Sequence, residues 1–207
     1  MINLVFNYSN EEQQIKFINR AEKRFMKKVL IPLAPGFEEI EAVTVVDILR
    51  RSGAKVSIAG TIAGLIEGSR GVKVVPDVYL DEISSNNIDL MVLPGGQPGT
   101  DNLMKDKRIT TLLKKMKEKE KLIGAICAAP IVLEVNGILK NKKRTCHPSV
   151  KQNLAGKLYS EKKVVIDGNI ITSQGPGTAM EFSLKLVEIL FGTDRMNVVK
   201  KAVLAQI

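Results

Sequence analysis

The chain has 207 residues, 44% of them hydrophobic and 26% charged, which excludes a disordered chain, a collagen and a coiled coil. Lysine and arginine outnumber the acidic residues by 31 to 22, and the net charge is +9. Aromatic residues make up only 4%, so side chains that could stack on bases are scarce, and we expect a solvated basic surface with no nucleic-acid partner.

Residues 1–26 differ from the rest of the chain. In them Ser9 is followed three residues later by Glu12, a spacing typical of a capping box at the start of a helix. We interpret 1–26 as a dispensable N-terminal extension and 27–207 as a single domain. No apolar run approaches the roughly 18 residues of a membrane span, and the two cysteines are too few for a disulfide framework. We therefore expect a cytoplasmic protein with free thiols and no membrane partner.

From residue 27 onward, apolar strands alternate with amphipathic helices. The pattern predicts strands at 27–34, 54–60, 71–80, 88–93 and 122–126, and helices at 37–53, 110–121, 128–137, 180–192 and from 193 to the end. Segment 144–150 is expected to be a strand end or a loop, and the turn Asp167-Gly168-Asn169 predicts a hairpin over 164–174. This alternation is typical of an α/β fold with a parallel sheet covered on both faces.

Three of these segments carry more detailed expectations. The helix at 37–53 is expected to bury one stripe, made of Ile40, Val43, Val46 and Ile48 or Leu49. The strand at 71–80 is expected to be peripheral, because Pro76 cannot donate a hydrogen bond to a neighbouring strand. Thr178 and Glu181 have the spacing of a capping box for the helix that follows them.

Ligands of a parallel α/β sheet bind at the carboxyl ends of its strands, and four predicted ends carry unusual residues. They are Pro35-Gly36, Pro94-Gly95-Gly96, Cys127 and His147-Pro148. The glycine turns GGQPGT and QGPGT lack the lysine of a phosphate loop and the full dinucleotide pattern. We interpret them as tight turns that bring backbone amides close to a substrate oxygen or to the cysteine.

Cys127 is the sharpest candidate for chemistry. It lies between the apolar strand LIGAI and the helix start AAP, which is the position of a nucleophile elbow. A helix N-terminus stabilises a thiolate, so we expect the pKa of this thiol to be lowered. The alternative is a small buried hydrophobic residue, as most free cysteines are. Its position favours the nucleophile.

Acidic residues open the helix at 37–53. Glu38 and Glu39 are explained by the helix dipole alone. Glu41 lies beside the inward stripe and is the acid expected to enter the crevice. Burial there would raise its pKa, so that its carboxyl could donate a hydrogen bond to a thiolate.

His147 is the only histidine, and it could serve in catalysis or as a structural hydrogen-bonding group. The neighbouring Cys146 could resolve an oxidised Cys127, or these three residues could bind a soft metal. Their spacing matches no usual zinc pattern, so we assign no metal ligand.

Together the motifs PLAPGFEEIEAVTVVDILRRSG, VLPGG, AICAAP and TSQGPGTAMEF resemble the ThiJ/PfpI superfamily, and most closely its parkinsonism-associated deglycase (DJ-one-like) subgroup. The resemblance runs from about residue 27 to the C-terminus. It implies a flavodoxin-like three-layer sandwich, usually a homodimer, that needs no cofactor.

The resemblance also implies roles for individual residues. Cys127 corresponds to the nucleophilic, oxidation-sensitive cysteine, Glu41 to its protonated partner and His147 to the nearby histidine. Backbone amides that face the reacting oxygen correspond to Gly95, Gly96 and Ala128. The rim of the site corresponds to Arg51 and Arg70, on the side of the dimer partner, and to the Pro176-Gly177 loop.

The activity that this resemblance implies is a glyoxalase or protein deglycase acting on 2-oxoaldehydes such as methylglyoxal and glyoxal, or on their early adducts with proteins. Protease-like members carry histidine directly after the nucleophile, where this chain has Ala128, and the amidotransferase triad needs a late histidine that is absent. The alternative is an oxidative-stress sensor or chaperone that is regulated by oxidation of Cys127 to a sulfinate, which a hydrogen bond from Glu41 would stabilise.

Overall fold

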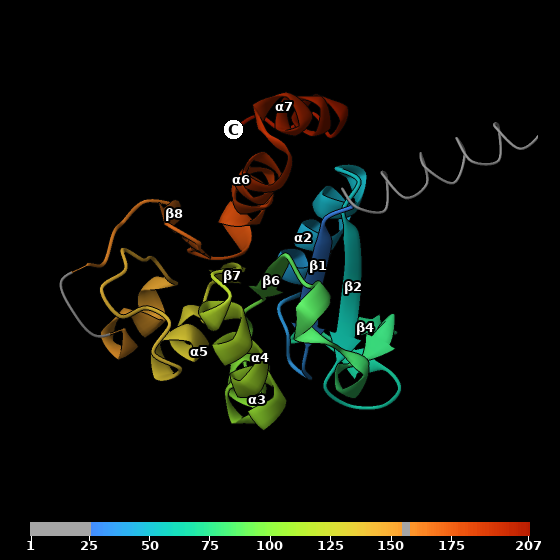
Figure 1. Cartoon of the computed structure of the whole chain (residues 1–207), viewed down its shortest axis with the longest axis vertical. Coiled ribbons are helices and arrows are strands. Elements are labelled where there is room, and N and C mark those ends of the chain that lie inside the picture. The colour runs from blue at the N-terminus through green and yellow to red at the C-terminus, as the bar shows by residue number, and fades with distance from the viewer. Residues whose placement is uncertain (1–25, 155–157) are drawn as a thin grey trace, which may run out of the picture.

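A computed structural model describes residues 26–154 and 158–207, which form three layers with a sheet in the middle (Figure 1). The capping box expected at Ser9 and Glu12 lies outside the described residues. The main sheet has seven strands in the order β5-β2-β1-β6-β7-β9-β8. All neighbouring pairs are parallel except β8 and β9, which form the predicted antiparallel hairpin. The fold is therefore the expected flavodoxin-like α/β sandwich.

The strands of this sheet agree well with the apolar segments of the sequence. They are β1 (Lys28–Leu33), β2 (Lys55–Gly60), β5 (Val78–Tyr79), β6 (Leu90–Leu93), β7 (Leu122–Ile126), β8 (Val164–Asp167) and β9 (Ile170–Ser173). A separate small hairpin pairs β3 (Ile66–Glu67) with β4 (Lys73–Val74).

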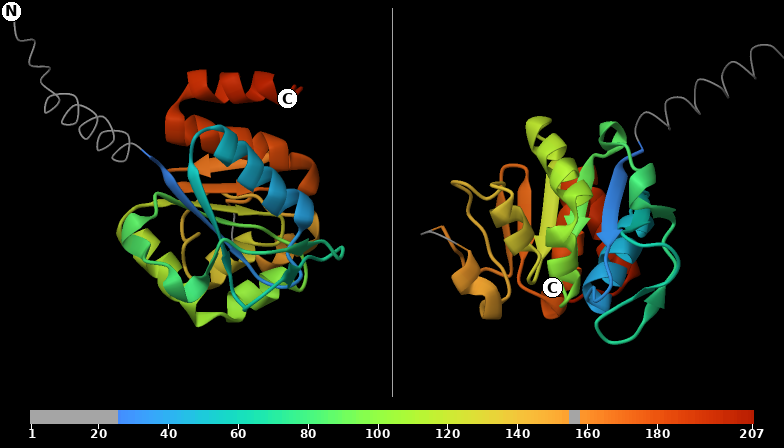
Figure 2. Two further views of the ribbon diagram at one scale, coloured as in Figure 1. Left: turned by 90° about the vertical axis from the view of Figure 1, so that its right-hand side faces the viewer. Right: turned by 90° about the horizontal axis from the view of Figure 1, so that it is seen from below.

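Helices cover both faces of the sheet, with α6 and α7 on one side and α3 and α4 on the other (Figure 2). The first layer contains α2 (Glu39–Arg51), α6 (Ala179–Phe191) and α7 (Thr193–Ala202), and the second contains α3 (Gly99–Lys105), α4 (Lys107–Glu118) and α5 (Pro130–Val135). In β1, Val29 and Ile31 belong to the first core while Leu30 belongs to the second. Alternate side chains point to opposite faces and both faces are buried, which is why the strand is apolar throughout. None of the described helices is long and apolar enough to cross a membrane.

The expected stripe of α2 is confirmed only in its second half, where Val46, Ile48 and Leu49 are buried. Ile40 and Val43 are 56% and 52% exposed, while Ala42 and Val45 are buried. In the first half of the helix the sequence offers apolar residues on two adjacent stripes, and packing against β2 and α6 selects the second one. The inward face of this half therefore lies about one residue from the expected one, and it includes Glu41, which is fully buried.

The structure refines one further expectation, for segment 71–80, and confirms another, since 144–150 is a loop, which is one of its two expected states. The segment 71–80 is peripheral as predicted, but it divides at Pro76 into β4 and β5. The segment 144–150 contributes only an isolated bridge between Arg144 and Tyr159 before a 3-10 helix, η3 (Pro148–Asn153), so His147 lies in a loop.

The capping box predicted at Thr178 and Glu181 does not form. The Thr178 hydroxyl accepts a hydrogen bond from the Gly175 amide at 3.0 Å and contacts the Ser173 hydroxyl at 2.7 Å. Glu181 instead lies 3.8 Å from Lys163. A 3-10 turn, η4 (Pro176–Thr178), precedes α6, and the threonine side chain stabilises that turn rather than the helix.

Candidate active site

Cys127 lies directly after β7, in a backbone conformation with φ of +64°. Residues other than glycine rarely adopt this left-handed conformation, and it is typical of strained turns at functional sites. Hydrogen bonds hold the turn on both sides: the Cys127 amide donates to the Ser173 carbonyl at 3.0 Å, and its carbonyl accepts from the His147 amide at 2.8 Å. The expected elbow is therefore present, with its side chain at the carboxyl edge of the sheet.

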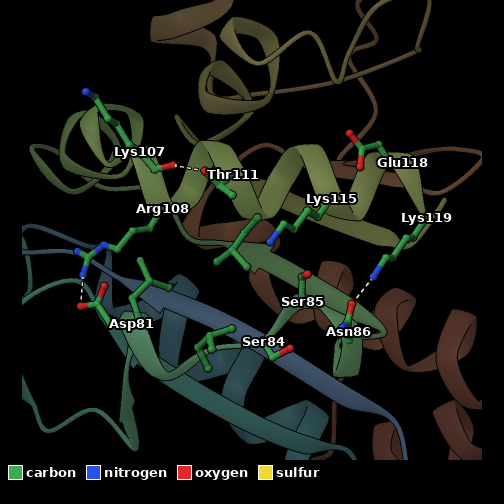
Figure 3. A pocket seen from close by; sticks show the side chains of 13 residues that line it. Asp81, Ser84, Ser85, Asn86, Lys107, Arg108, Thr111, Lys115, Glu118 and Lys119 are labelled. Carbon is green, nitrogen blue, oxygen red and sulfur yellow. Dashed lines mark hydrogen bonds and ion pairs between the residues drawn. The ribbon is translucent and has the colours of Figure 1, made fainter.

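The Cys127 side chain opens into a pocket of about 290 Å³. Six chain regions line it, through Glu38, Ser69, Arg70, Gly96, Gln97, Cys127, Ala128, His147, Ser149, Val150 and Pro176. A larger hollow of about 680 Å³ lies elsewhere, between α4 and the 80–86 segment (Figure 3). Lysine, serine and threonine side chains surround that hollow, and its lining contains neither cysteine nor histidine. The pocket at Cys127 is therefore the candidate active site.

Glu41 lies beneath this pocket and has no exposed surface. Its Oε2 accepts a hydrogen bond from the Gly95 amide at 2.8 Å, while Oε1 has no conventional hydrogen-bond partner among the described residues. Gly95 permits this approach, because a Cβ there would lie 2.7 Å from the Cys127 Cβ and 2.8 Å from Glu41 Oε2. Burial raises the pKa of Glu41 to about 7, as expected from the sequence.

The thiol of Cys127 differs from its expected state. Burial and the neighbouring Glu41 carboxylate raise its pKa, and the amides of Ala128 and Gly96 only partly oppose them. The expected lowering by a helix N-terminus was wrong, because α5 begins three residues later and has only six residues. Two negative charges in one buried site disfavour each other, so a proton on Glu41 removes the repulsion that opposes the thiolate.

The expected amide donors divide between two tasks. Gly95 donates to Glu41, so its amide is not free for a substrate oxygen. The amides of Gly96 and Ala128 lie against the Cys127 sulfur instead. Gly96 has φ of +92°, and a Cβ there would lie 2.4 Å from the Glu38 nitrogen, so glycine is required at this close approach.

His147 borders the pocket and is oriented by Ser149. Its Nδ1 accepts a hydrogen bond from the Ser149 amide at 3.2 Å and lies 2.7 Å from the Ser149 hydroxyl. An accepting Nδ1 places the proton of the neutral ring on Nε2. A Cβ on Gly175 would lie 3.3 Å from the His147 ring and 3.9 Å from the Cys127 sulfur, so this turn packs close to both groups.

The structure separates the residues expected at the rim. Arg70 and Pro176 line the pocket, whereas Gly177 does not. Arg51 pairs with Asp47 at 2.7 Å at the far end of α2, about 15 Å along the helix from Glu41. It does not reach the pocket of its own chain, and its role on the side of a dimer partner stays a prediction.

Sequence reasoning missed several pocket residues: Glu38, Ser69, Gln97, Ser149 and Val150. Each lies within three residues of a predicted site residue. Neighbours of the predicted positions were the only signal that could have found them.

Cys146 is fully buried in the core beneath α3, α4 and α5. Its thiol lies 3.3 Å from the His147 carbonyl, and burial raises its pKa to about 11. A resolving role would require this side chain to leave the core. Within residues 26–154 and 158–207, no group of three histidine, cysteine or acidic side chains is placed to hold a metal ion.

These features define a class of protein: a flavodoxin-like α/β domain with a cysteine at a strained strand end beside a buried carboxyl group. The sequence profile of the DJ-1/PfpI family matches residues 27–189, and the chain belongs to that family. This confirms the resemblance found in the sequence.

Relatives and solved structures agree with this assignment. Protein dj-1beta of Drosophila melanogaster is 43% identical over 86% of this chain and 97% of its own, and its crystal structure superposes with a TM-score of 0.85, at 41% identity over 88% of this chain and 100% of that one. Glutathione-independent glyoxalase DJR-1.2 of Caenorhabditis elegans is 41% identical over 83% of this chain and 92% of its own. DJ-1 homolog A of Arabidopsis thaliana is 47% identical over 86% of this chain, which spans only 46% of that protein.

Replacing Glu41 should change how stability depends on pH. The pKa of Glu41 is raised in the folded state, so its neutral form stabilises the fold below about pH 4.5, and this stability is lost as pH rises toward 7. A rise from 4.5 to about 7 corresponds to about 3 kcal/mol. Between pH 4.5 and 8, the free energy of unfolding of the wild type, measured with urea, should therefore fall by up to this amount relative to that of Glu41→Gln. A constant difference across this range would contradict the raised pKa.

Proposed function

We propose that the protein is a cofactor-independent glyoxalase or deglycase that acts on 2-oxoaldehydes or on their early adducts with proteins. The observation that carries this proposal is the Cys127 thiol, partly exposed in a pocket, beside a buried Glu41 whose pKa is about 7. A group with such a pKa can both give and take a proton near neutral pH. The relative named as a glutathione-independent glyoxalase supports the same chemistry.

The proposed reaction begins at the aldehyde carbon of methylglyoxal. The Glu41 carboxylate takes the proton of the Cys127 thiol as the sulfur bonds to that carbon, and it passes this proton to the aldehyde oxygen, giving a hemithioacetal. The amides of Gly96 and Ala128 are the donors placed to stabilise the developing oxyanion. The Nε2–H of His147 is a further donor at the border of the pocket.

Glu41, now a carboxylate, then moves the proton of the aldehyde carbon to the neighbouring carbon, and the product is a thioester of lactate. Water cleaves the carbon–sulfur bond and releases lactate and the free thiol. The aldehyde carbon is oxidised and its neighbour is reduced, so electrons balance within the substrate and the reaction needs no cofactor. On a protein adduct, the same attack would free the amine or thiol. We place this activity in the cytoplasm, where Cys127 and Cys146 stay reduced.

A redox role is the second candidate. The same Cys127 sulfur lies against two backbone amides and beside Glu41, and these groups would stabilise a sulfinate by hydrogen bonds. Cys146 is fully buried and thus protected from the same oxidant. A structure of Toxoplasma gondii DJ-1, described as oxidized, resembles this chain with a TM-score of 0.85 at 36% identity, over 87% of this chain and 100% of that one.

We also propose a homodimer formed through α2. Ile40 and Val43 are exposed apolar residues on this helix, which is otherwise well packed. Arg51 and Asp47 lie on the same outward side as Ile40, at spacings of about three and two helical turns. A second copy seated on this face would bury the apolar pair and bring Arg51 near the partner.

The enzyme proposal predicts lactate production from methylglyoxal by the wild-type protein. Cys127→Ala removes the nucleophile and Glu41→Gln the proton carrier, so we expect each to lower kcat/KM by at least about 100-fold. Lactate detection and loss of methylglyoxal measure the rate, and Cys146→Ala is the control that keeps activity. If folded wild-type protein converts neither methylglyoxal nor a methylglyoxal-treated peptide, the enzyme proposal fails.

The redox proposal predicts selective oxidation. Mild peroxide should add two oxygens to the Cys127 peptide and none to the Cys146 peptide, because only the first thiol reaches solvent. Peptide mass after digestion measures this, and circular dichroism checks that the fold is retained. Equal oxidation of both cysteines, or unfolding at the first oxidation step, would contradict the proposal.

The dimer proposal predicts that Ile40→Glu yields a monomer, because it places a charge in the apolar contact. Val135→Glu is the matched control, since Val135 is 60% exposed on α5, in the opposite layer. Sedimentation velocity gives the mass of each variant. A wild-type monomer, or a dimer that survives Ile40→Glu, would refute the assignment of this face.

A further inference from the structure

Glu39 is a nearly buried acid that takes no part in the chemistry proposed above. Only 8% of its surface is exposed, although it lies in the first turn of α2. Its Oε1 accepts hydrogen bonds from the amide of Arg70 at 2.6 Å and from that of Val72 at 3.4 Å, and its Oε2 accepts from the Ser69 hydroxyl at 3.2 Å. All three donors belong to the 68–72 turn between β3 and β4. One carboxylate thus binds a whole turn.

Gly68 leaves the space in which this carboxylate lies. A Cβ at Gly68 would be 2.4 Å from Glu39 Oε1 and 2.5 Å from its Cδ, far inside van der Waals contact. The φ of Gly68 is outside the left-handed region, so its backbone conformation does not require glycine. The reason for glycine here is space for the Glu39 side chain.

The same turn forms the outer wall of the Cys127 pocket, through Ser69 and Arg70. Regular structure behind it is slight, because β3 and β4 have two residues each. Backbone contacts to the rest of the domain include the Ser69 amide, which donates to the Phe37 carbonyl at 2.8 Å. Without Glu39, the amides of Arg70 and Val72 would lose their acceptor.

Charge strengthens this attachment. Burial acts to raise the pKa of Glu39, but the hydrogen bonds from Arg70, Val72 and Ser69 outweigh it and lower the pKa below its usual value. Glu39 is therefore ionised at neutral pH, and its hydrogen bonds are charge-assisted, the one from the Arg70 amide being short at 2.6 Å.

We propose that Glu39 is a positioning residue for the Cys127 site: its carboxylate, seated against Gly68, fixes the 68–72 turn so that Arg70 stands at the mouth of the pocket. The guanidinium then favours electrophiles that carry negative charge over neutral ones of the same size. The inference rests on the proposed function only in taking Cys127 as the reacting group.

The test compares two alkylating reagents of similar size, anionic iodoacetate and neutral iodoacetamide. The ratio of their rates at Cys127, measured by mass of the Cys127 peptide, reports the charge at the pocket mouth and cancels changes in thiol reactivity. Arg70→Ala sets the reference, and removing one cation from the wall of the pocket should lower the ratio about two- to fivefold.

Two variants then release the turn in different ways. Gly68→Ala displaces the carboxylate without changing charge, and Glu39→Ala removes it without adding bulk. Removal of a negative charge by itself would raise the ratio, so a fall in Glu39→Ala comes from lost position. We expect both variants to fall toward the Arg70→Ala value, and Glu39→Ala combined with Arg70→Ala to fall no further than Arg70→Ala alone.

Glu67→Ala is the matched control. It also removes one negative charge, but from the β3–β4 hairpin itself, where Glu67 pairs with Lys73 at 3.8 Å and is mostly exposed. Its ratio should be unchanged or raised. Glu39→Gln, which keeps an acceptor for the Arg70 amide, should recover part of the wild-type ratio.

The proposal is overturned if Gly68→Ala and Glu39→Ala, with wild-type circular dichroism, keep the wild-type ratio or rise with Glu67→Ala. Should Glu39→Ala not fold, Gly68→Ala against Arg70→Ala decides the question by the same ratio. Alkylation needs no turnover, so an inactive wild type would remove the proposed enzyme function and leave this test unchanged.

Discussion

The site depends on one contact, the seating of the Glu41 carboxylate on the amide of Gly95. A buried carboxylate loses its solvation, and a single amide replaces little of it. The pKa of Glu41 is therefore about 7, and the acid is near the midpoint of its titration at neutral pH. That contact requires a glycine, since any Cβ at this position would collide with Cys127 and Glu41 together. The protonation state of Glu41 thus depends on how closely the backbone after β6 packs against α2.

This dependence explains why the backbone amides of the site have two different acceptors. The amide of Gly95 donates a hydrogen bond to Glu41, whereas the amides of Gly96 and Ala128 lie against the Cys127 sulfur. The pocket wall shows a similar arrangement, because Glu39 occupies the space that a side chain at Gly68 would fill. In both places an absent side chain lets a carboxylate reach backbone amides of a distant segment. Two acids of one helix turn therefore differ in protonation because one meets a single donor and the other meets three.

Much of the fold could be predicted because apolar strands buried on both faces have an unmistakable pattern, and Cys127 was found from its place at the end of one of them. The inward face of the first half of α2 could not be predicted, since Ile40 and Val43 make as good a stripe as Ala42 and Val45 until packing selects one. Strands of two residues, such as β3, carry no periodicity at all. Two features of the pocket come from loops: its wall at 68–72 and the orientation of His147 by Ser149. The partner of the wall, Glu39, is distant in the sequence, whereas Ser149 almost adjoins His147. Neither relation produces a residue spacing that could be recognised in the sequence.

The backbone at Cys127 has a consequence for how the protein is made. Its left-handed turn is held by the carbonyl of Ser173, on β9, and by the amide of His147, both of which follow it in the chain. During synthesis the cysteine leaves the ribosome before either partner exists, and β9 must enter the sheet beside β7 before the turn can be fixed. The nascent chain therefore carries an ordinary thiol, and the distinctive chemistry begins only once the last strand is in place.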